Sequence, residues 1–212
     1  MITIAINKGR IYEETVQLLL KAKILDQAST KEDRRLVFPS PHGDYRFLVV
    51  RSADVPIYVE RGAADIGVTG KDSIMEYGGS MTFYETMDLG LGKCRMMTAW
   101  PKESPEPFGK IKVATKFVNI AREYFDSQNR QVEMIKLSGA LEIAPSLGLS
   151  DCIVDLVATG ETLNANGMEP RELIAEISSR LIVNRAALKT KFDEINVFTN
   201  LITGVSSEAE GD

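Results

Sequence analysis

The sequence predicts an α/β fold, because short apolar strands alternate along the chain with segments whose apolar residues recur at helical spacing. Residues 2–6 are apolar at almost every position, as in a buried strand, and residues 12–22 follow with a helical pattern. The stretch 101–109 then holds three prolines and interrupts the alternation. With 212 residues, 44% of them hydrophobic, the chain can bury one large core or two modest ones.

The first half of the chain continues the alternation. In order we expect a strand over 47–50, a short helix after Asp54, a strand over 65–69 and a helix over 71–77 that two glycines close. Asp54 can cap the short helix, Pro56 suits its first turn, and Gly62 suits its C-terminal stop.

A second α/β unit is expected beyond the proline-rich stretch. The patterns predict a strand over 111–114, a helix over 117–125, strands over 132–137 and 152–157, one long β-like segment over 172–183 and a closing helix over 186–202. Cys94 and Cys152 each lie inside an apolar strand pattern and lack the spacing of a metal site. We therefore expect both cysteines to be buried as small hydrophobic residues.

The charge balance excludes some classes of protein. A net charge of −5 argues against a nucleic-acid partner, since such proteins usually carry a basic excess, so local cations must do any anion binding. No charged-then-apolar leader opens the chain, and no apolar run approaches the ~20 residues that span a bilayer. We expect a cytoplasmic protein without a membrane partner. The one histidine, His42, lies between Pro41 and Gly43 and is expected to be exposed in a turn.

The most informative segment is 153–162, in which a buried strand opens into a small, hydroxyl-rich turn. Asp155 stands among apolar residues, where a carboxylate is costly unless something pairs with it, and a ligand hydroxyl is one candidate. Thr159 and Thr162 supply hydroxyls, and Gly160 lets successive amides converge on an anion, which the N-terminus of a following helix would favour further. This arrangement is typical of an enzyme that handles a phosphoribosyl group. An ordinary strand-to-helix connection with a capping threonine remains an alternative.

Several cations directly follow predicted strands, and the carboxyl ends of strands are where α/β proteins usually bind ligands. Lys8 and Arg10 come after the first strand, and their alternative role as solvated charges is weakened because cations oppose the dipole of a helix start. Arg51 ends a strand in the same way. Arg34 lies in a polar run that fits a solvated face equally well. Lys71 stands at a helix start, where we expect it to face the ligand cleft.

Two short motifs resemble those of other protein classes but are incomplete. Gly70-Lys71 lacks the upstream glycine of a P-loop, because Asp65 occupies that position. A dinucleotide-binding dehydrogenase would need a full glycine fingerprint after the first strand, and the segment 7–10 has one glycine only. A solute-binding protein would normally carry an export signal, which the chain does not show.

Residues 142–163 resemble the signature of the ATP phosphoribosyltransferases, which catalyse the first step of histidine biosynthesis. The resemblance extends over nearly the whole chain, through residues 8–10, 54–56, 59–60, 62–72, 91–95 and 179–185. Asn7 departs from the family, which more often has proline there, but the change removes no charge. The resemblance implies a bilobal fold like that of the periplasmic binding proteins, with a substrate cleft between two α/β lobes. Residues 1–90 and 181–212 would form the first lobe, and 91–180 the inserted second lobe.

The reaction implied is displacement at C1 of 5-phosphoribosyl pyrophosphate by N1 of ATP, which gives phosphoribosyl-ATP and pyrophosphate. It needs no protein nucleophile. The resemblance implies Mg²⁺ held mainly by substrate phosphates, with no protein metal ligands. The residues expected at the site fall into three groups: catalytic Lys8, Arg10 and Arg51; phosphoribosyl pyrophosphate ligands Glu142, Asp155, Ala158, Thr159, Gly160, Glu161 and Thr162; and ATP or pyrophosphate ligands Arg34, Lys71, Ser138 and Gly139. For Ser138, Gly139 and Glu142, a helix cap followed by a first-turn acid remains the alternative.

The end of the chain bears on regulation. Longer members of the family carry a C-terminal regulatory domain that senses histidine, whereas the acidic residues 206–212 cannot build one. The chain thus resembles the short form. The resemblance implies a homodimer that joins a regulatory subunit similar to histidyl-tRNA synthetase, in a hetero-octamer.

Overall fold

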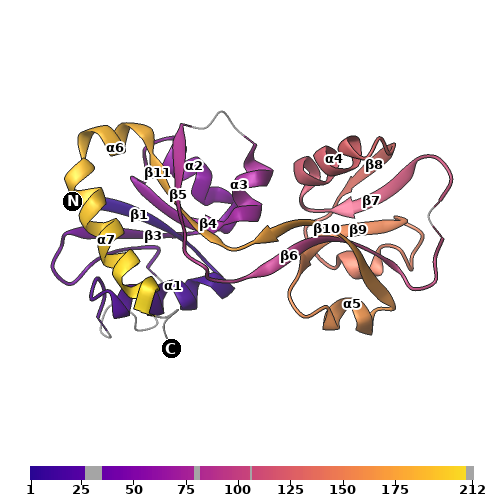
Figure 1. The fold of residues 1–212 in the computed structure, drawn as a ribbon, viewed down its shortest axis with the longest axis horizontal. Helices are drawn as coiled ribbons and strands as arrows, with labels where there is room; N and C mark the ends of the chain where they lie inside the picture. The colour runs from indigo at the N-terminus through magenta and orange to yellow at the C-terminus, as the bar shows by residue number, and fades with distance from the viewer. Residues whose placement is uncertain (27–34, 79–81, 106, 209–212) are drawn as a thin grey trace. The chain divides into compact units, whose positions relative to one another are not determined.

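The chain forms two compact α/β units, which confirms the predicted fold class. The structure, a computed structural model, describes residues 1–26, 35–78, 82–105 and 107–208, except the side chains of Arg10 and of residues 206–208. The first unit comprises Met1–Ile74, Gly79–Gly92 and Ser178–Asp212, and the second comprises Met75–Gly78 and Lys93–Ile177. Each unit contains one sheet with helices packed on it (Figure 1).

The first unit has a six-stranded sheet in the order β2-β3-β1-β4-β11-β5. Strands β3, β1 and β4 are parallel, and the other three run antiparallel to their neighbours. Its elements are β1 (Ile2–Asn7), α1 (Arg10–Lys21), β2 (Val37–Pro39), β3 (Tyr45–Val50), a 3₁₀ helix η1 (Ser52–Asp54), α2 (Val55–Glu60), β4 (Ile66–Gly70), the start of α3 (Lys71–Tyr77), β5 (Phe83–Asp88), β11 (Ser179–Asn184), α6 (Arg185–Thr190) and α7 (Phe192–Glu208). The rest of α3, from Met75 on, belongs to the second unit.

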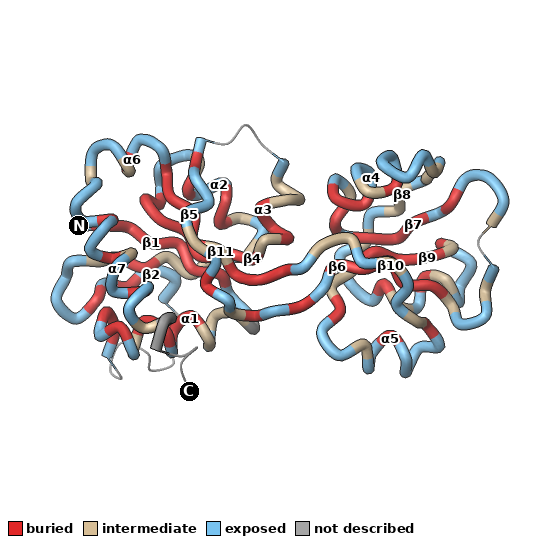
Figure 2. The backbone as a smooth tube through the Cα atoms, viewed as in Figure 1, coloured by how far each residue is buried: buried red, intermediate tan, exposed pale blue. Residues whose placement is uncertain are grey.

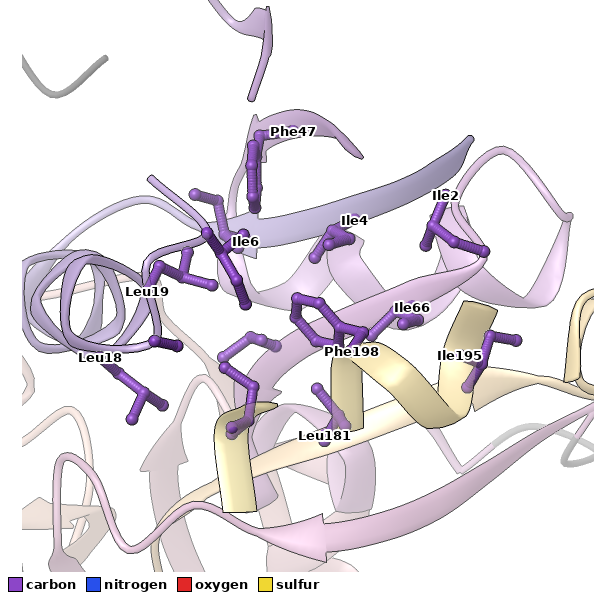
Figure 3. Packing of buried hydrophobic residues seen from close by; sticks show 14 of the residues in the cluster. Ile2, Ile4, Ile6, Leu18, Leu19, Phe47, Ile66, Leu181, Ile195 and Phe198 are labelled. Carbon is purple, nitrogen blue, oxygen red and sulfur yellow. The ribbon is translucent and has the colours of Figure 1, made fainter. Parts of the chain in front are cut away.

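The core of the first unit forms between β1 and the C-terminal helix. All six residues of β1 are buried, and Phe198 of α7 is fully buried in the same hydrophobic cluster as Ile4 and Ile66. Figure 3 shows the Phe198 ring among these side chains, with Leu181 of β11 on its other side. A buried phenylalanine of this kind stabilises a fold by about 3–5 kcal/mol relative to alanine. Helix α7 is therefore held to the sheet by its apolar face.

The second unit has a five-stranded sheet in the order β10-β6-β9-β7-β8, in which β8, β7 and β9 are parallel. One hydrophobic cluster includes Trp100 and Phe125 and the other includes Ile153 and Leu163. Figure 2 shows the buried backbone following β7 and β9 while most of α5 is exposed. Its elements are β6 (Cys94–Pro101), β7 (Ile111–Thr115), α4 (Val118–Ser127), β8 (Val132–Lys136), a 3₁₀ helix η2 (Leu141–Ile143), β9 (Cys152–Val157), α5 (Glu161–Ala165) and β10 (Met168–Ile177).

Three local expectations need correction. The segment 172–183 is not one strand, because β10 pairs with β6 in the second sheet whereas β11 pairs with β4 and β5 in the first. The closing helix is likewise two helices, which meet at Lys191. Asp54 takes the N-cap position of α2 but makes no side-chain capping hydrogen bond. Gly62, by contrast, follows the end of α2 with φ +71°, as its expected role requires.

The expectations for the two cysteines and for the histidine are confirmed. Cys94 and Cys152 are both buried, and His42 is exposed in a turn between β2 and β3. Among the residues that the structure describes, no helix is both long and apolar enough to cross a membrane.

Candidate functional site

Parallel strands end at a common edge in each unit, and most of the expected site residues follow such ends. In the second unit Lys116 follows β7, the segment 137–140 follows β8, and the turn 158–160 follows β9. The carboxyl ends of parallel strands are where α/β proteins usually bind their ligands. This edge of the second unit is the candidate site that the structure describes in most detail.

The turn after β9 has the conformation that its glycine was expected to provide. Gly160 adopts φ +83° and ψ 3°, in the left-handed region that favours glycine, and helix α5 begins directly after it. Thr159 and Thr162 are exposed, and the Thr159 hydroxyl accepts a long hydrogen bond of 3.4 Å from the Glu161 amide. Ala158 is exposed as well. The turn therefore presents small residues and hydroxyl groups at the surface. The helix that follows it, α5, is only five residues long.

Asp155 is the half-buried carboxylate that the sequence predicts within β9. Its side chain is 23% exposed, yet its Oδ1 atom is buried and has no hydrogen-bond partner among the described residues. The exposed fraction therefore belongs to other atoms of the side chain. Burial raises the pKa of Asp155, the Glu142 carboxylate raises it further, and the Lys116 ammonium together with the Leu156 backbone lowers it.

Lys116 is a site residue that the sequence analysis missed. Its Nζ lies 3.6 Å from Asp155 Oδ1, which is an ion-pair distance but longer than a hydrogen bond. Sequence spacing does not reveal the contact between Lys116 and Asp155, because the two residues belong to segments that are far apart in the chain. The signal that could have found it is its place directly after a strand, which it shares with Lys8 and Arg51.

The segment between β8 and β9 holds three expected site residues, and one of them, Glu142, interacts with Asp155. Glu142, in η2, is half-buried and acts on the Asp155 carboxylate, whereas Ser138 and Gly139 are exposed. The N-cap position of η2 belongs to Ala140, at φ +50°, and not to Ser138. The alternative role of Ser138 as a helix cap is therefore wrong.

The cations of the first unit follow the ends of its parallel strands. Lys8 follows β1 and is exposed, and its amide donates a hydrogen bond of 2.7 Å to the Val50 carbonyl at the end of β3. Arg51, also exposed, comes directly after β3. Between Lys8 and α1, Gly9 adopts φ +119°, and a Cβ there would meet no described atom within 4 Å other than those of its two chain neighbours, so the backbone has room for a ligand.

Lys71, which begins α3 after β4, has a partner inside the first unit. Its Nζ donates to Glu85 Oε2 at 2.6 Å, and the other Glu85 oxygen lies 3.5 Å from Arg180 Nε. Arg10 begins α1, but its side chain is not described, and Arg34 lies outside the described residues. Within the described ranges, no group of three His, Cys, Asp or Glu residues could hold a metal ion.

Known proteins resemble the chain over nearly its whole length. The HisG family model, described as ATP phosphoribosyltransferase, matches residues 51–204. The ATP phosphoribosyltransferase of Marinobacter nauticus is 56% identical over 195 residues, which are 92% of this chain and 91% of that relative. The ATP phosphoribosyltransferase of Pseudomonas putida is 50% identical over 212 residues and covers all of both chains.

Solved structures resemble this chain at two levels of similarity, one high and one limited to the fold. A chain of the ATP phosphoribosyl transferase (HisG:HisZ) complex from Thermotoga maritima superposes with a TM-score of 0.87 at 32% identity, over 98% of this chain and 100% of that one. The aliphatic sulphonate-binding protein SsuA of Escherichia coli gives a TM-score of 0.59 at 14% identity, over 99% of this chain and 70% of that one. This second likeness confirms the expected periplasmic-binding-protein fold and extends to the fold alone.

Proposed function

The chain belongs to the ATP phosphoribosyltransferase family, and we propose that its second unit binds the phosphoribosyl group through Asp155 and the turn 158–162. The family's reaction transfers the 5-phosphoribosyl group of phosphoribosyl pyrophosphate to N1 of ATP, the first step of histidine biosynthesis. The proposal therefore assigns residues to the two substrates of a known reaction.

The observation that supports the second-unit site most strongly is the placement of Asp155. A partly buried carboxylate in an apolar strand carries a desolvation cost, and it lies just ahead of a left-handed glycine turn. Hydroxyls O2 and O3 of a ribose would donate to the exposed part of Asp155. The 5-phosphate would lie against Thr159, Gly160 and Thr162, with Ala158 and Glu161 in the same turn and Glu142 beside Asp155.

The first unit would supply cations to the polyphosphate groups. Lys8, Arg10 and Arg51 are proposed as the catalytic cations, which stabilise the pyrophosphate as it leaves. Arg34, Lys71, Ser138 and Gly139 are proposed to contact ATP or pyrophosphate. For Lys71 this role requires the ammonium to exchange its Glu85 partner for a phosphate.

The chemistry is a displacement that depends on alignment and charge. N1 of adenine attacks C1 of the ribose in line with the departing pyrophosphate oxygen, so binding both substrates in register supplies much of the rate enhancement. Positive charge develops on the ribose, and the ionised Asp155 carboxylate next to the ribose hydroxyls would stabilise it. Asp155 thus acts by electrostatics and hydrogen bonding.

We also propose Mg²⁺ as the cofactor. The proposed ligands of both substrates are mainly cations, hydroxyls and amides, which suit phosphate oxygens, so the ion would arrive on the substrate phosphates. It would neutralise charge on the leaving pyrophosphate.

The assembly is proposed by analogy with the Thermotoga maritima relative, which was solved as a HisG:HisZ complex. This chain would form a homodimer and join a regulatory subunit similar to histidyl-tRNA synthetase, in a hetero-octamer. We propose a cytoplasmic location, where ATP and phosphoribosyl pyrophosphate are made.

The test is to incubate the chain with ATP, phosphoribosyl pyrophosphate and Mg²⁺, with and without such a subunit, and to follow the ultraviolet absorbance of the adduct. We expect phosphoribosyl-ATP to form, and histidine to inhibit only when the subunit is present. Absence of product under both conditions would contradict the proposed function, and passive binding of a small anion would favour a solute-binding protein instead.

A further inference from the structure

The turn after β7 is tied to β9 by a threonine. The Thr115 hydroxyl donates a hydrogen bond of 2.7 Å to the Val154 carbonyl and accepts one of 2.9 Å from the Phe117 amide. The parallel register also pairs Thr115 with Val154. The next residues of the two segments, Lys116 and Asp155, are therefore held side by side by the backbone.

The Lys116 side chain covers one oxygen of the Asp155 carboxylate. Its Nζ lies 3.6 Å from Asp155 Oδ1, the buried oxygen, and 4.7 Å from the centre of the Phe117 ring. The ring provides a second, cation–π attraction for the ammonium. Because Lys116 contacts Oδ1 and the Asp155 side chain is still 23% exposed, the exposed atoms of Asp155 stay available to another partner.

The charges around Asp155 favour a cation at this position. Glu142 faces Asp155 from η2, and Lys116 faces it from the turn after β7. On β6, Met97 is paired with Asp155, and Arg95 lies one side-chain position further along the same face, opposite Val157. The Asp155 and Glu142 carboxylates thus interact while both are partly buried. This favours protonation of one of them unless a nearby cation offsets their repulsion.

We infer that Lys116 is a positioning residue of the phosphoribosyl site, which keeps the Asp155 carboxylate ionised and its outer atoms directed to the ribose hydroxyls. The inference rests on the proposed function of Asp155. Lys116 acts on the substrate through Asp155 and needs no contact with the substrate itself.

The direct test measures Asp155 without using the reaction. The ¹³C resonance of its carboxyl carbon is titrated in the full-length protein and in three variants, Lys116→Met, Lys116→Arg and Lys112→Met. Lys112 is an exposed lysine of β7, the strand that Lys116 follows, so it serves as the matched control. We expect the pKa of Asp155 to rise in Lys116→Met, to return towards the wild-type value in Lys116→Arg, and to be unchanged in Lys112→Met. An unchanged pKa in Lys116→Met would overturn the inference.

A kinetic test follows, in the presence of the regulatory subunit. In Lys116→Met, the acid limb of kcat/KM for phosphoribosyl pyrophosphate should move to higher pH, with a loss of about tenfold on that limb. In an Asp155→Asn background the same substitution should cause little further loss. Full additivity of the two losses would show that Lys116 does not act through Asp155. A wild-type enzyme that forms no adduct would contradict the proposed function, and the titration would still decide the role of Lys116.

Discussion

Lys191 forms an ion pair with both oxygens of Asp65, with Nζ 2.8 Å from each, and so fastens the junction of α6 and α7 to the residue that precedes β4. Asp65 Oδ2 also accepts a 2.8 Å hydrogen bond from the Thr3 amide of β1. One carboxylate thus joins three segments of the first unit. Asp65 is 8% exposed, so these partners offset much of the cost of burying its carboxylate.

The first prediction concerns stability. Asp65→Ala removes an acceptor from a buried amide and a partner from Lys191, and we expect the free energy of unfolding to fall by about 2–4 kcal/mol. Lys191→Met should cost less, about 1–2 kcal/mol, because the lysine is partly exposed and Thr3 still binds Asp65. Urea unfolding of both variants measures this, with Lys189→Met, an exposed lysine of α6, as the control. Equal stability of all three variants would contradict the prediction.

The second prediction concerns the turn after β9. Gly160→Val places a side chain at φ +83° and should raise the KM for phosphoribosyl pyrophosphate strongly, because its backbone strain of about 1–2 kcal/mol either shifts the turn or leaves a side chain at the phosphate. The fold should remain intact, since an added Cβ has only an ordinary contact of 3.7 Å with Val157. Gly167→Val is the matched control, because Gly167 adopts φ +70° in open space just after α5. Similar KM values in the two variants would remove the turn from the site.

The third prediction separates catalysis from stability at Asp155. Asp155→Asn should lower kcat/KM by a factor that corresponds to about 2 kcal/mol, because a charged hydrogen-bond acceptor is lost. The pKa of Asp155 is raised in the folded protein, mainly by burial, so ionisation of this group destabilises the fold as the pH rises through that pKa. At neutral pH the Asn variant should therefore be at least as stable as the wild type. Thermal unfolding below and above the pKa measures this, and a less stable variant with normal kinetics would indicate a purely structural role.

The fourth prediction tests Arg51. Arginine binds phosphate with a planar fork that lysine lacks, so Arg51→Lys should lower kcat/KM by about tenfold. The residue is exposed, and the melting temperature should not change. Arg61→Lys, at the exposed end of α2, should keep full activity. If Arg51→Lys has wild-type kinetics, Arg51 does not bind a substrate phosphate through its fork.

The sequence predicted most of the strands whose burial is uniform; β6 is the exception, since only the apolar pattern around Cys94 pointed to it. Strand β1 is buried at all six positions, and β9 ends at the turn where the glycine was expected to allow a left-handed backbone. Strands β2 and β5 were not predicted, because they lie at the two edges of their sheet and are exposed at most positions, so they lack a clear apolar period. The boundary between β10 and β11 was missed because strand-like residues lie on both sides of Ser178 and no glycine or proline marks the break.

The grouping of candidate site residues was predicted where residues close in sequence are also close in space. Asp155, Thr159, Gly160 and Thr162 lie on one strand, the turn after it and the start of α5, so spacing alone groups them. Lys116 belongs to the same place through strand register, which a single sequence does not reveal.

The position of β11 determines the order in which the chain can fold during synthesis. Strand β11 lies between β4 and β5, and Arg180 pairs with Thr69 on one side and Asp88 on the other. Almost all of the second unit, Lys93–Ile177, leaves the ribosome before β11 is made. The second unit can therefore fold first. Until β11 is made, β4 and β5 each have an unpaired strand edge, and such edges favour association with other chains. A growing chain of this enzyme is most exposed to aggregation in that interval, and the interval ends when the last residues of β11 emerge.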